Sequence, residues 1–283
     1  MPAAITLYKN ISMILGISSF TYGWAVGMNP DNPKLDAFDL LNKVKGYGLK
    51  CLQLGDNLPL HNMSDSAMRN FKIALKENSI RLEVGARKLT ENHLQRYLDV
   101  TKFLEAPLIR FVVDADDYQP SGQTIVSILR NALPELKRNQ IILGIENHDR
   151  FKATELAKVM DAISDEHVGI CLDSVNSIGA GEGIEWVTDA LAPYTVNLHI
   201  KDFAIQRFSH KMGFIVAGAP AGSGMMDVPS IIKKLMPFGR CKSAILEQWT
   251  PPEVSLDITI EKEIAWADEG IKYLRSLPYF GTE

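Results

Sequence analysis

Four residues that can bind a metal or move a proton each follow a short apolar run. The residues at these run ends are Glu146, Asp173, His199 and Glu247. Three carboxylates that met beside an imidazole in one pocket would repel one another and raise each other's pKa unless a cation offset them. An oxygen-rich set of this kind suits one divalent metal ion, with Mn²⁺ expected and Mg²⁺, Co²⁺ or Zn²⁺ as alternatives.

The elements that must position these residues alternate along the whole chain between apolar strands and amphipathic helices. The predicted strands are Met13–Ser18, Lys50–Leu54, Ile80–Val84, Leu108–Val113, Ile142–Glu146, Val168–Asp173, Val196–Ile200 and Ser243–Glu247. The predicted helices are 34–46, 64–78, 90–104, 121–138, 152–163, 184–191, 228–236 and 257–276, with Ser64 and Thr90 as N-caps and Pro229 in a first turn. Eight such pairs predict an α/β fold, a (β/α)₈ TIM barrel, as a single domain over residues 1–283.

Parity along the strands predicts that the four residues converge. Side chains alternate between the two faces of a strand, so Glu146 and His148 share one face, as do His199 and Lys201. The large apolar residues between them would face the helices. In a parallel barrel the carboxyl ends of the strands meet at one rim, where active sites are built. An open doubly wound sheet is disfavoured because 18–24 is not a glycine-rich phosphate loop.

Each residue also has a structural interpretation. A single strand-end carboxylate is commonly a helix cap or an ion-pair partner, and a single histidine a satisfied core residue. Lys201 is expected either to act on a substrate oxygen or to extend along the rim. Glu83 and Arg87 share inward parity, which is compatible with a structural ion pair. Four ligands with matching parity on adjacent strands nevertheless favour the metal site.

These residues resemble the xylose-isomerase-like barrel superfamily of sugar isomerases and epimerases. The resemblance is carried by I-E-N-H-D at 145–149, C-L-D-S-V-N at 171–176, L-H-I-K-D at 198–202 and L-E-Q-W at 246–249, with a glycine loop at 222–224. Ketose 3-epimerases, inosose dehydratases and endonuclease IV share this barrel. The resemblance implies that Glu146, Asp173, His199 and Glu247 hold the metal, and that the two glutamates also move protons.

Two positions depart from the family pattern. Asn176 stands where the family often has a histidine, and it can bind a substrate hydroxyl but cannot act as a base. The substrate-binding arginine after the metal histidine has no equally spaced equivalent, and Arg207 is the candidate in its place. His148 is expected to be an auxiliary acid–base group. Trp24 and Trp249 are expected to stack on the substrate at the rim.

The expected function is that of a metal-dependent sugar isomerase or epimerase. It would abstract a proton next to a carbonyl through an enediolate, with Glu146 and Glu247 as the two proton-transfer groups and Lys201 and His148 assisting. A lyase or dehydratase of a keto-sugar or inosose starts with the same step and stays open as an alternative. A sugar-binding barrel without catalysis is the second alternative, disfavoured because all four ligands are present. The interval 203–226 is expected to be a long loop that covers the substrate or sets specificity.

Composition limits the partners. The net charge of −4 gives no reason to expect nucleic acid, and strands two and three lack the histidines that a three-zinc endonuclease site needs. No apolar stretch is long enough to cross a bilayer, so no membrane partner is expected. Three widely spaced cysteines indicate free thiols and a cytoplasmic location. The expected partner is a small sugar or keto-sugar, and the resemblance leaves a homo-oligomer open.

Overall fold

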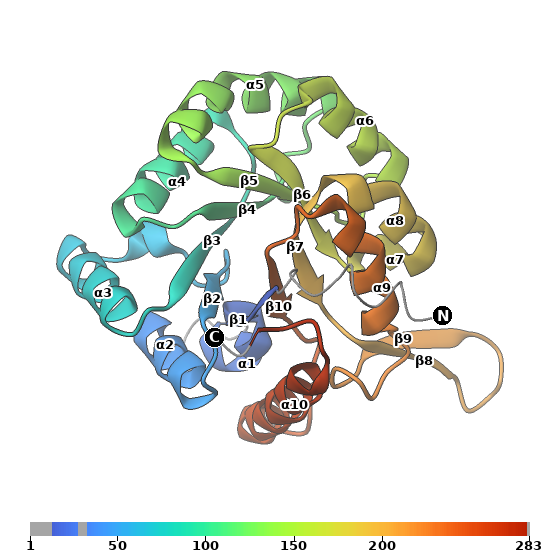
Figure 1. The fold of residues 1–283 in the computed structure, drawn as a ribbon. Helices are drawn as coiled ribbons and strands as arrows, with labels where there is room; N and C mark the ends of the chain where they lie inside the picture. The colour runs from blue at the N-terminus through green and yellow to red at the C-terminus, as the bar shows by residue number, and fades with distance from the viewer. Residues whose placement is uncertain (1–12, 28–32, 282–283) are drawn as a thin grey trace, which may run out of the picture.

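Eight parallel strands close into a barrel at the centre of the computed structural model, which describes residues 13–27 and 33–281 (Figure 1). The strands run around the barrel in the order β1-β10-β7-β6-β5-β4-β3-β2. Their bounds are Ile14–Ser18 (β1), Cys51–Leu54 (β2), Arg81–Arg87 (β3), Leu108–Val112 (β4), Ile142–Glu146 (β5), Val168–Asp173 (β6), Thr195–Ile200 (β7) and Ser243–Leu246 (β10). The predicted TIM barrel and its eight strands are confirmed.

Helices surround the barrel and join consecutive strands. The longer ones are Ala37–Gly46 (α2), Asp65–Glu77 (α3), Glu91–Leu104 (α4), Gly122–Asn139 (α5), Ala153–Ile163 (α6), Ile184–Leu191 (α8), Val228–Leu235 (α9) and Leu256–Ser276 (α10). The short ones are Gly23–Val26 (α1), Asn176–Gly179 (α7), Ser19–Tyr22 (η1), Leu60–Asn62 (η2), Ala192–Tyr194 (η3) and Met236–Phe238 (η4). Ser64 and Thr90 are N-caps and Pro229 lies in the first turn of α9, as predicted.

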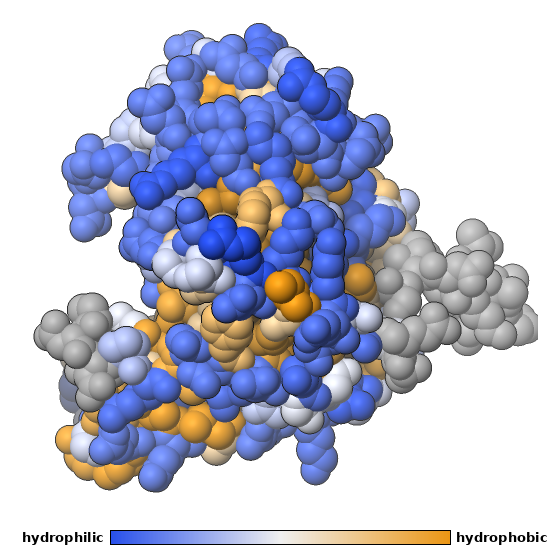
Figure 2. All heavy atoms as spheres, turned by 90° about the vertical axis from the view of Figure 1, so that its left-hand side faces the viewer, coloured by the Kyte–Doolittle hydropathy of each residue, from blue (hydrophilic) through white to orange (hydrophobic). Residues whose placement is uncertain are grey.

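The apolar face of each outer helix packs on the barrel, and its polar face meets water. In α4, for example, the buried side chains of Leu94, Tyr97 and Leu98 recur at helical spacing and join the outward-facing strand residues in one core. On the face drawn in Figure 2, hydrophilic side chains cover most of the surface and apolar ones show between them. Among the described residues, no helix has both the length and the apolar composition needed to span a membrane.

The barrel interior contains a buried, fully bonded carboxylate at Glu83. Its Oε1 accepts hydrogen bonds from Ser243 Oγ at 2.6 Å and Arg81 Nε at 3.2 Å. Its Oε2 accepts from Gln53 Nε2 and Asn197 Nδ2, both at 3.1 Å. Burying a charge costs free energy unless it is paired and hydrogen-bonded, and these four donors meet that condition. Glu83 therefore cross-links four strands below the rim.

The ion pair considered between Glu83 and Arg87 is not formed. Glu83 pairs with Arg81, two residues before it on the same face of β3. Arg87 lies at the other end of the strand, and its Nε donates to Asp56 Oδ2 at 2.9 Å. Inward parity was correct for both residues, but the three residues between them along the strand separate their side chains. Parity does not give the depth of a residue in the barrel.

The predicted loop 203–226 contains an antiparallel hairpin. Its strands are Phe203–Arg207 (β8) and Phe214–Gly218 (β9), which project from the barrel in Figure 1. A Cβ at Gly218 would collide with the backbone oxygen of Trp249, so only glycine allows the base of the hairpin to lie this close to β10. The segment is therefore ordered β structure seated beside the rim rather than one long loop.

The segment after β1 is held by Glu263 of α10. The carboxylate of Glu263 accepts hydrogen bonds from the backbone N–H groups of Trp24 at 2.9 Å and Ala25 at 3.2 Å. Its backbone oxygen accepts from Gln248 Nε2 at 2.8 Å. Burial raises the pKa of Glu263 to about 7, although the backbone donors and nearby Lys43 oppose this rise. The rim geometry on this side thus depends on one buried carboxyl group.

Stability is therefore expected to depend on pH through Glu263. Between the ordinary pKa of 4.5 and about 7, the folded state holds a proton that the unfolded chain has lost. The free energy of unfolding should then fall as pH rises through this window, by up to about 3 kcal/mol. Chemical denaturation at pH 5 and pH 8 measures this change, which Glu263→Gln should lack and the exposed control Glu261→Gln should keep. Equal pH dependence in all three proteins would contradict it.

Candidate metal centre

The four predicted ligands meet at the carboxyl ends of four neighbouring strands. Glu146 ends β5, Asp173 ends β6, His199 lies on β7, and Glu247 directly follows β10. All four are at most 3% exposed. The Nδ1 atom of His199 lies 3.7 Å from Glu146 Oε2, 3.9 Å from Asp173 Oδ2 and 3.5 Å from Glu247 Oε1. Two ligands of one ion at roughly 2.1–2.3 Å lie about 3–4 Å apart, so this spacing fits one metal ion.

Hydrogen bonds below the cluster fix the tautomer of His199. Gln53 donates through its amide nitrogen to Glu83 and Asn197, so its oxygen must be the acceptor for His199 Nε2 at 2.7 Å. The Nε2 atom of His199 therefore carries a proton, and Nδ1 is the ring atom that faces the carboxylates and is available to a metal ion when the ring is neutral. Ligating histidines are commonly oriented in this way by a partner behind the ring.

Two buried atoms in the cluster accept no hydrogen bond from any described residue. They are Nδ1 of His199 and Oδ2 of Asp173. The other oxygen of Asp173 accepts from the backbone N–H groups of Val175 at 2.8 Å and Asn176 at 2.9 Å, which aims Oδ2 at the cluster. Lys201 Nζ lies 2.8 Å from Asp173 Oδ2 as an ion pair, but no described residue bonds His199 Nδ1, and a buried polar atom without a partner is costly. A cation bound among these atoms would remove that cost. The residues present thus fit a divalent ion.

Cys171 is the other residue whose ligand atom falls within reach, together with Glu146 and His199. Its Sγ donates to Asn197 Oδ1 at 3.1 Å. Burial raises the pKa of the Cys171 thiol well above its usual range, with the carboxylate of Glu146 adding to the effect. A metal ligand must be the thiolate, so the set with Asp173 is the better one. Cys171 is a fully buried free thiol.

Two buried cations border the cluster. Lys201 Nζ lies 2.8 Å from Asp173 Oδ2 and 3.0 Å from Glu247 Oε2, and Arg110 Nε pairs with Glu146 Oε2. Burial by itself lowers the pKa of both basic groups, but the carboxylates outweigh it and raise both values. Burial likewise raises the pKa of Glu247, yet the positive groups around it lower that pKa to about 2.

Arg110 was not singled out from the sequence, although a signal was present. It is the one charged residue in the run Leu-Ile-Arg-Phe-Val of β4 and is 3% exposed. Its Nη1 donates to Asp56 Oδ1 at 2.8 Å, while the other oxygen of Asp56 binds Arg87. A buried charge inside an apolar strand needs partners of opposite charge. Its presence in the sequence therefore indicates that other ionisable groups lie inside the barrel. Gln53 and Asp56 were likewise missed, because their roles depend on contacts across the barrel.

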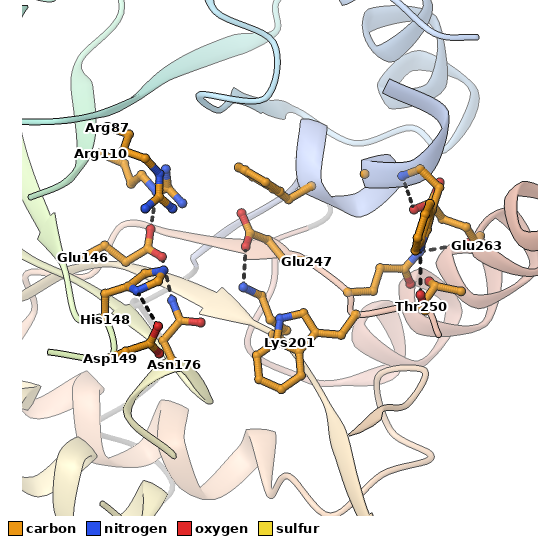
Figure 3. A pocket seen from close by; sticks show the side chains of 15 residues that line it. Arg87, Arg110, Glu146, His148, Asp149, Asn176, Lys201, Glu247, Thr250 and Glu263 are labelled. Carbon is orange, nitrogen blue, oxygen red and sulfur yellow. Dashed lines mark hydrogen bonds and ion pairs between the residues drawn. The ribbon is translucent and has the colours of Figure 1, made fainter. Parts of the chain in front are cut away.

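A cavity of about 440 Å³ opens above the cluster (Figure 3). The sequence-predicted residues that line it are Glu146, Glu247, Lys201, His148, Asn176, Trp24 and Trp249. Arg87, Arg110, Phe20 and Glu263 line it too. In Figure 3, Glu146 lies on the side of Arg87 and Arg110, and Glu247 lies on the side of Lys201. The predicted convergence of strand ends thus produces one pocket.

The remaining predicted residues on the rim differ in position. Asn176 Nδ2 donates to Glu146 Oε1 at 2.8 Å, so its amide holds the glutamate as well as facing the cavity. His148 Nδ1 lies 3.2 Å from Asp149 Oδ2 at the pocket edge. Trp24 Nε1 donates to the backbone oxygen of Thr250 at 2.8 Å, and Lys201 Nζ lies 5.7 Å from the ring centre of Trp249.

Arg207 lies away from the cavity. It is on the exposed hairpin, where its Nη1 donates to the backbone oxygen of Lys211 at 2.9 Å and its guanidinium stacks on Phe214. It does not line the pocket. Substrate binding by Arg207 remains a prediction, one that this arrangement does not favour. The cationic side chains in the pocket come from β3 and β4 and from just after β7.

The glycine loop at 222–224 is fixed by the last residue of the L-H-I-K-D motif. Asp202 accepts hydrogen bonds from the backbone N–H groups of Gly222, Gly224 and Met226. A Cβ at Gly224 would collide with the Asp202 carboxylate. The strand-end motif therefore has two roles, because His199 lies in the ligand cluster and Lys201 lines the cavity, while Asp202 anchors the loop leading to α9.

Comparison with known proteins agrees with the barrel fold. Residues 41–277 match the model of the family described as "Xylose isomerase-like TIM barrel". This chain belongs to that family. A curated relative, 3-oxo-isoapionate decarboxylase from Pectobacterium atrosepticum, is 30% identical over 262 residues, covering 93% of this chain and 95% of the relative.

Solved structures share the fold at low identity. A xylose isomerase-like TIM barrel protein from Mycobacterium smegmatis in complex with magnesium has a TM-score of 0.66 and 15% identity, covering 94% of this chain and 98% of the other. A D-psicose 3-epimerase, solved in the presence of D-fructose, has a TM-score of 0.67 and 16% identity, covering 93% and 98%. This chain, like the named decarboxylase and epimerase, is an enzyme.

Replacing Gln53 should weaken metal binding without disturbing the cavity. Gln53→Met keeps a similar volume but leaves His199 Nε2 without its acceptor, so the ring is no longer held with Nδ1 toward the carboxylates. Affinity for Mn²⁺ is expected to fall about 10- to 100-fold, measured by isothermal titration calorimetry. Gln95→Met, on the exposed face of α4, is the matched control. Unchanged Mn²⁺ affinity in Gln53→Met would exclude this positioning role.

Proposed function

We propose that this enzyme is a divalent-metal-dependent decarboxylase of a 3-oxo sugar acid. Glu146, Asp173, His199 and Glu247 hold the ion, with Mn²⁺ or Mg²⁺ expected from the oxygen-rich set. Two facts support the proposal: the hydrogen bonding of the two glutamates, and the charge balance of the pocket. The named decarboxylase relative adds weight because it covers nearly the whole chain.

The contacts of the glutamates carry the choice of reaction. Glu247 accepts from Ser18 Oγ at 3.1 Å and lies 3.0 Å from Lys201 Nζ. Glu146 accepts from Asn176 and pairs with Arg110. Every oxygen of the two carboxylates is thus engaged by a donor or cation. For Glu247 the surrounding positive groups lower the pKa, which weakens this carboxylate as a base. Epimerisation needs such a base to remove a proton from carbon, whereas decarboxylation does not.

The charge balance favours an anionic substrate. The network of ion pairs around the cluster holds four carboxylates, those of Asp56, Glu146, Asp173 and Glu247, while Asp149 and Glu263 line the cavity outside this network. Arg87, Arg110 and Lys201 supply three positive charges. This leaves one net negative charge, which a divalent ion changes to one net positive charge. A singly charged sugar acid would restore neutrality, while a neutral ketose would leave a charge uncompensated in a largely desolvated site.

The name of the relative describes an acid whose carbonyl is β to the carboxylate. When the bond between carbons 1 and 2 breaks, CO₂ leaves and its bonding electron pair moves into an enolate on carbons 2 and 3, an enediolate where carbon 2 carries a hydroxyl. The ion, when bound, would supply Lewis-acid stabilisation of that developing negative charge. One proton then returns to carbon 2, which gives a hydroxyketone.

The pocket residues have matching roles in this proposal. Lys201 is the candidate to return the proton or to orient a substrate oxygen, since its ammonium lies beside Glu247 within the cavity. His148 is an auxiliary acid–base group at the edge. Trp24 and Trp249 exclude water from one wall and offer aromatic faces to the C–H bonds of a sugar. The three buried free thiols fit a reducing cytoplasm, which we propose as the location.

Isomerisation or epimerisation of a keto-sugar is the second candidate function. Glu146 and Glu247 lie toward opposite sides of the pocket in Figure 3, as two proton-transfer groups on the two faces of a substrate would. The fold is shared with a D-psicose 3-epimerase. The same enediolate serves both reactions, so only the products separate them.

Decarboxylation is expected to require a divalent metal and Glu247. With 3-oxo-isoapionate as first substrate, the Mn²⁺-loaded enzyme should release one CO₂ per turnover. In D₂O it should place one deuterium on the carbon that lost the carboxylate. EDTA should abolish the activity, Mn²⁺ should restore it, and Glu247→Gln should lower kcat/KM at least about 100-fold. The control Glu253→Gln removes an exposed carboxylate outside the cavity.

Two results would contradict the decarboxylase proposal. Deuterium uptake into a ketose without CO₂ release from any 3-oxo acid would make the enzyme an isomerase or epimerase. Activity that survives complete removal of divalent metal would exclude both candidates.

A further inference from the structure

Two arginines on one wall of the cavity are tied together by a single carboxylate. Asp56 binds Arg110 Nη1 through Oδ1 at 2.8 Å and Arg87 Nε through Oδ2 at 2.9 Å. Both guanidinium groups line the cavity, and Figure 3 shows them on the side of Glu146. Because one carboxylate spans both, the two groups are fixed relative to each other before any substrate arrives.

Donors remain free on both arginines. Arg110 uses Nε for Glu146 and Nη1 for Asp56, and within the described part of the chain nothing bonds its Nη2. Arg87 uses only Nε, again counting only described partners. Arg110 is 3% exposed and lines the cavity, as Arg87 does. A carboxylate in the cavity could therefore accept hydrogen bonds from the donors that these two side chains leave unused.

The charges on this wall do not cancel internally. Asp56 offers one negative charge to two guanidinium groups, and the second partner of Arg110 is Glu146, one of the proposed metal ligands. If Glu146 shares its charge with a divalent ion, less of it compensates Arg110. The wall then attracts an anion. Planar guanidinium groups match a carboxylate in particular, because two parallel N–H donors can meet its two oxygens.

We propose that Arg87 and Arg110 form the carboxylate-binding subsite for the substrate, with Asp56 as the positioning residue that holds them. The inference rests on the proposed function and deepens it by assigning the acid-specific contact to β3 and β4. A substrate carboxylate held on this wall lies beside the cluster rather than within it. The carbonyl and its neighbouring hydroxyl are left to face the metal ligands.

This arrangement also controls the reacting bond. Two arginines fix the plane and direction of the carboxylate, and the ligand cluster fixes the carbonyl. The torsion about the bond between carbons 1 and 2 is then set by the protein, so the bond can lie perpendicular to the carbonyl plane, where its electrons enter the enolate. Most of the contact is made equally in the ground state, so its loss should raise KM more than it lowers kcat.

The test compares an acid with its neutral counterpart. D-erythronate and erythritol are the probes, titrated calorimetrically into Mn²⁺-saturated protein. The wild type should bind erythronate at least about 10-fold more tightly than erythritol. Arg87→Gln should weaken erythronate about 10- to 100-fold and leave erythritol unchanged, because it removes only charge-assisted donors. Arg87→Lys keeps the positive charge but loses the two parallel N–H donors, so its affinity for erythronate should lie between those of the wild type and Arg87→Gln.

The matched control is Lys88→Gln. Lys88 is the neighbouring residue, carries the same charge, and pairs with Asp117 outside the cavity at 2.6 Å. If Lys88→Gln lowers the affinity for erythronate as much as Arg87→Gln does, the effect is long-range attraction and the proposed subsite is rejected. Metal content by elemental analysis must be equal in all variants, which separates the subsite from metal binding.

Two further outcomes overturn the proposal. A wild type without preference for erythronate, including one that binds neither probe measurably, has no carboxylate subsite. A preference that persists in Arg87→Gln puts the carboxylate on the metal or on Lys201. Either result leaves the decarboxylase proposal standing, because CO₂ release is measured separately. A wild type that prefers erythronate but releases no CO₂ would instead reject the decarboxylation and keep the subsite.

Discussion

Repulsion between three buried carboxylates is the constraint on which this site depends. Glu146, Asp173 and Glu247 approach one imidazole nitrogen within 4 Å, in a region that water barely reaches. Such a cluster persists only if positive charge is supplied from several directions. The barrel supplies it in two ways, through fixed cations on the surrounding strands and through a ligand geometry that fits a divalent ion. The chemistry follows from that same compensation.

Hydrogen bonds in the polar interior of the barrel set the orientation of the residues at the rim. Glu83 orients Gln53, and Gln53 in turn orients His199. The direction in which His199 Nδ1 points is therefore set by a carboxylate that does not line the cavity. In this series of hydrogen bonds each donor and acceptor is fixed, because the ionised Glu83 carboxylate can only accept. A site built this way needs no reorganisation when a ligand arrives, which is the property that electrostatic stabilisation of a transition state requires. The cost is a polar barrel interior that must be fully bonded.

Charge compensation also divides the pocket into two sides. Arg87 and Arg110 approach from β3 and β4, and Lys201 approaches from just beyond β7, with the ligand cluster between them. The aromatic rim closes the remaining wall, held by Glu263 of α10. An anionic substrate would meet cations on one side and apolar surface on the other. Shared folds with epimerases therefore do not imply a shared substrate, because substrate choice lies in such wall residues rather than in the barrel.

The sequence by itself determined the fold and the strand-end residues that converge at the rim. Apolar periodicity and capping residues such as Ser64 and Thr90 are local signals, and strand parity is a local rule, so eight strands, eight helices and the convergence of Glu146 and His199 could be predicted from them. Only the tertiary structure decided which charges meet. Arg110 and Asp56 are 54 residues apart, and their pairing depends on the register and depth of strands closed into a barrel. The 203–226 interval lacks the strand–helix alternation found elsewhere, so its hairpin could not be read locally, and Arg207 lies outside the pocket because that hairpin projects away from the barrel.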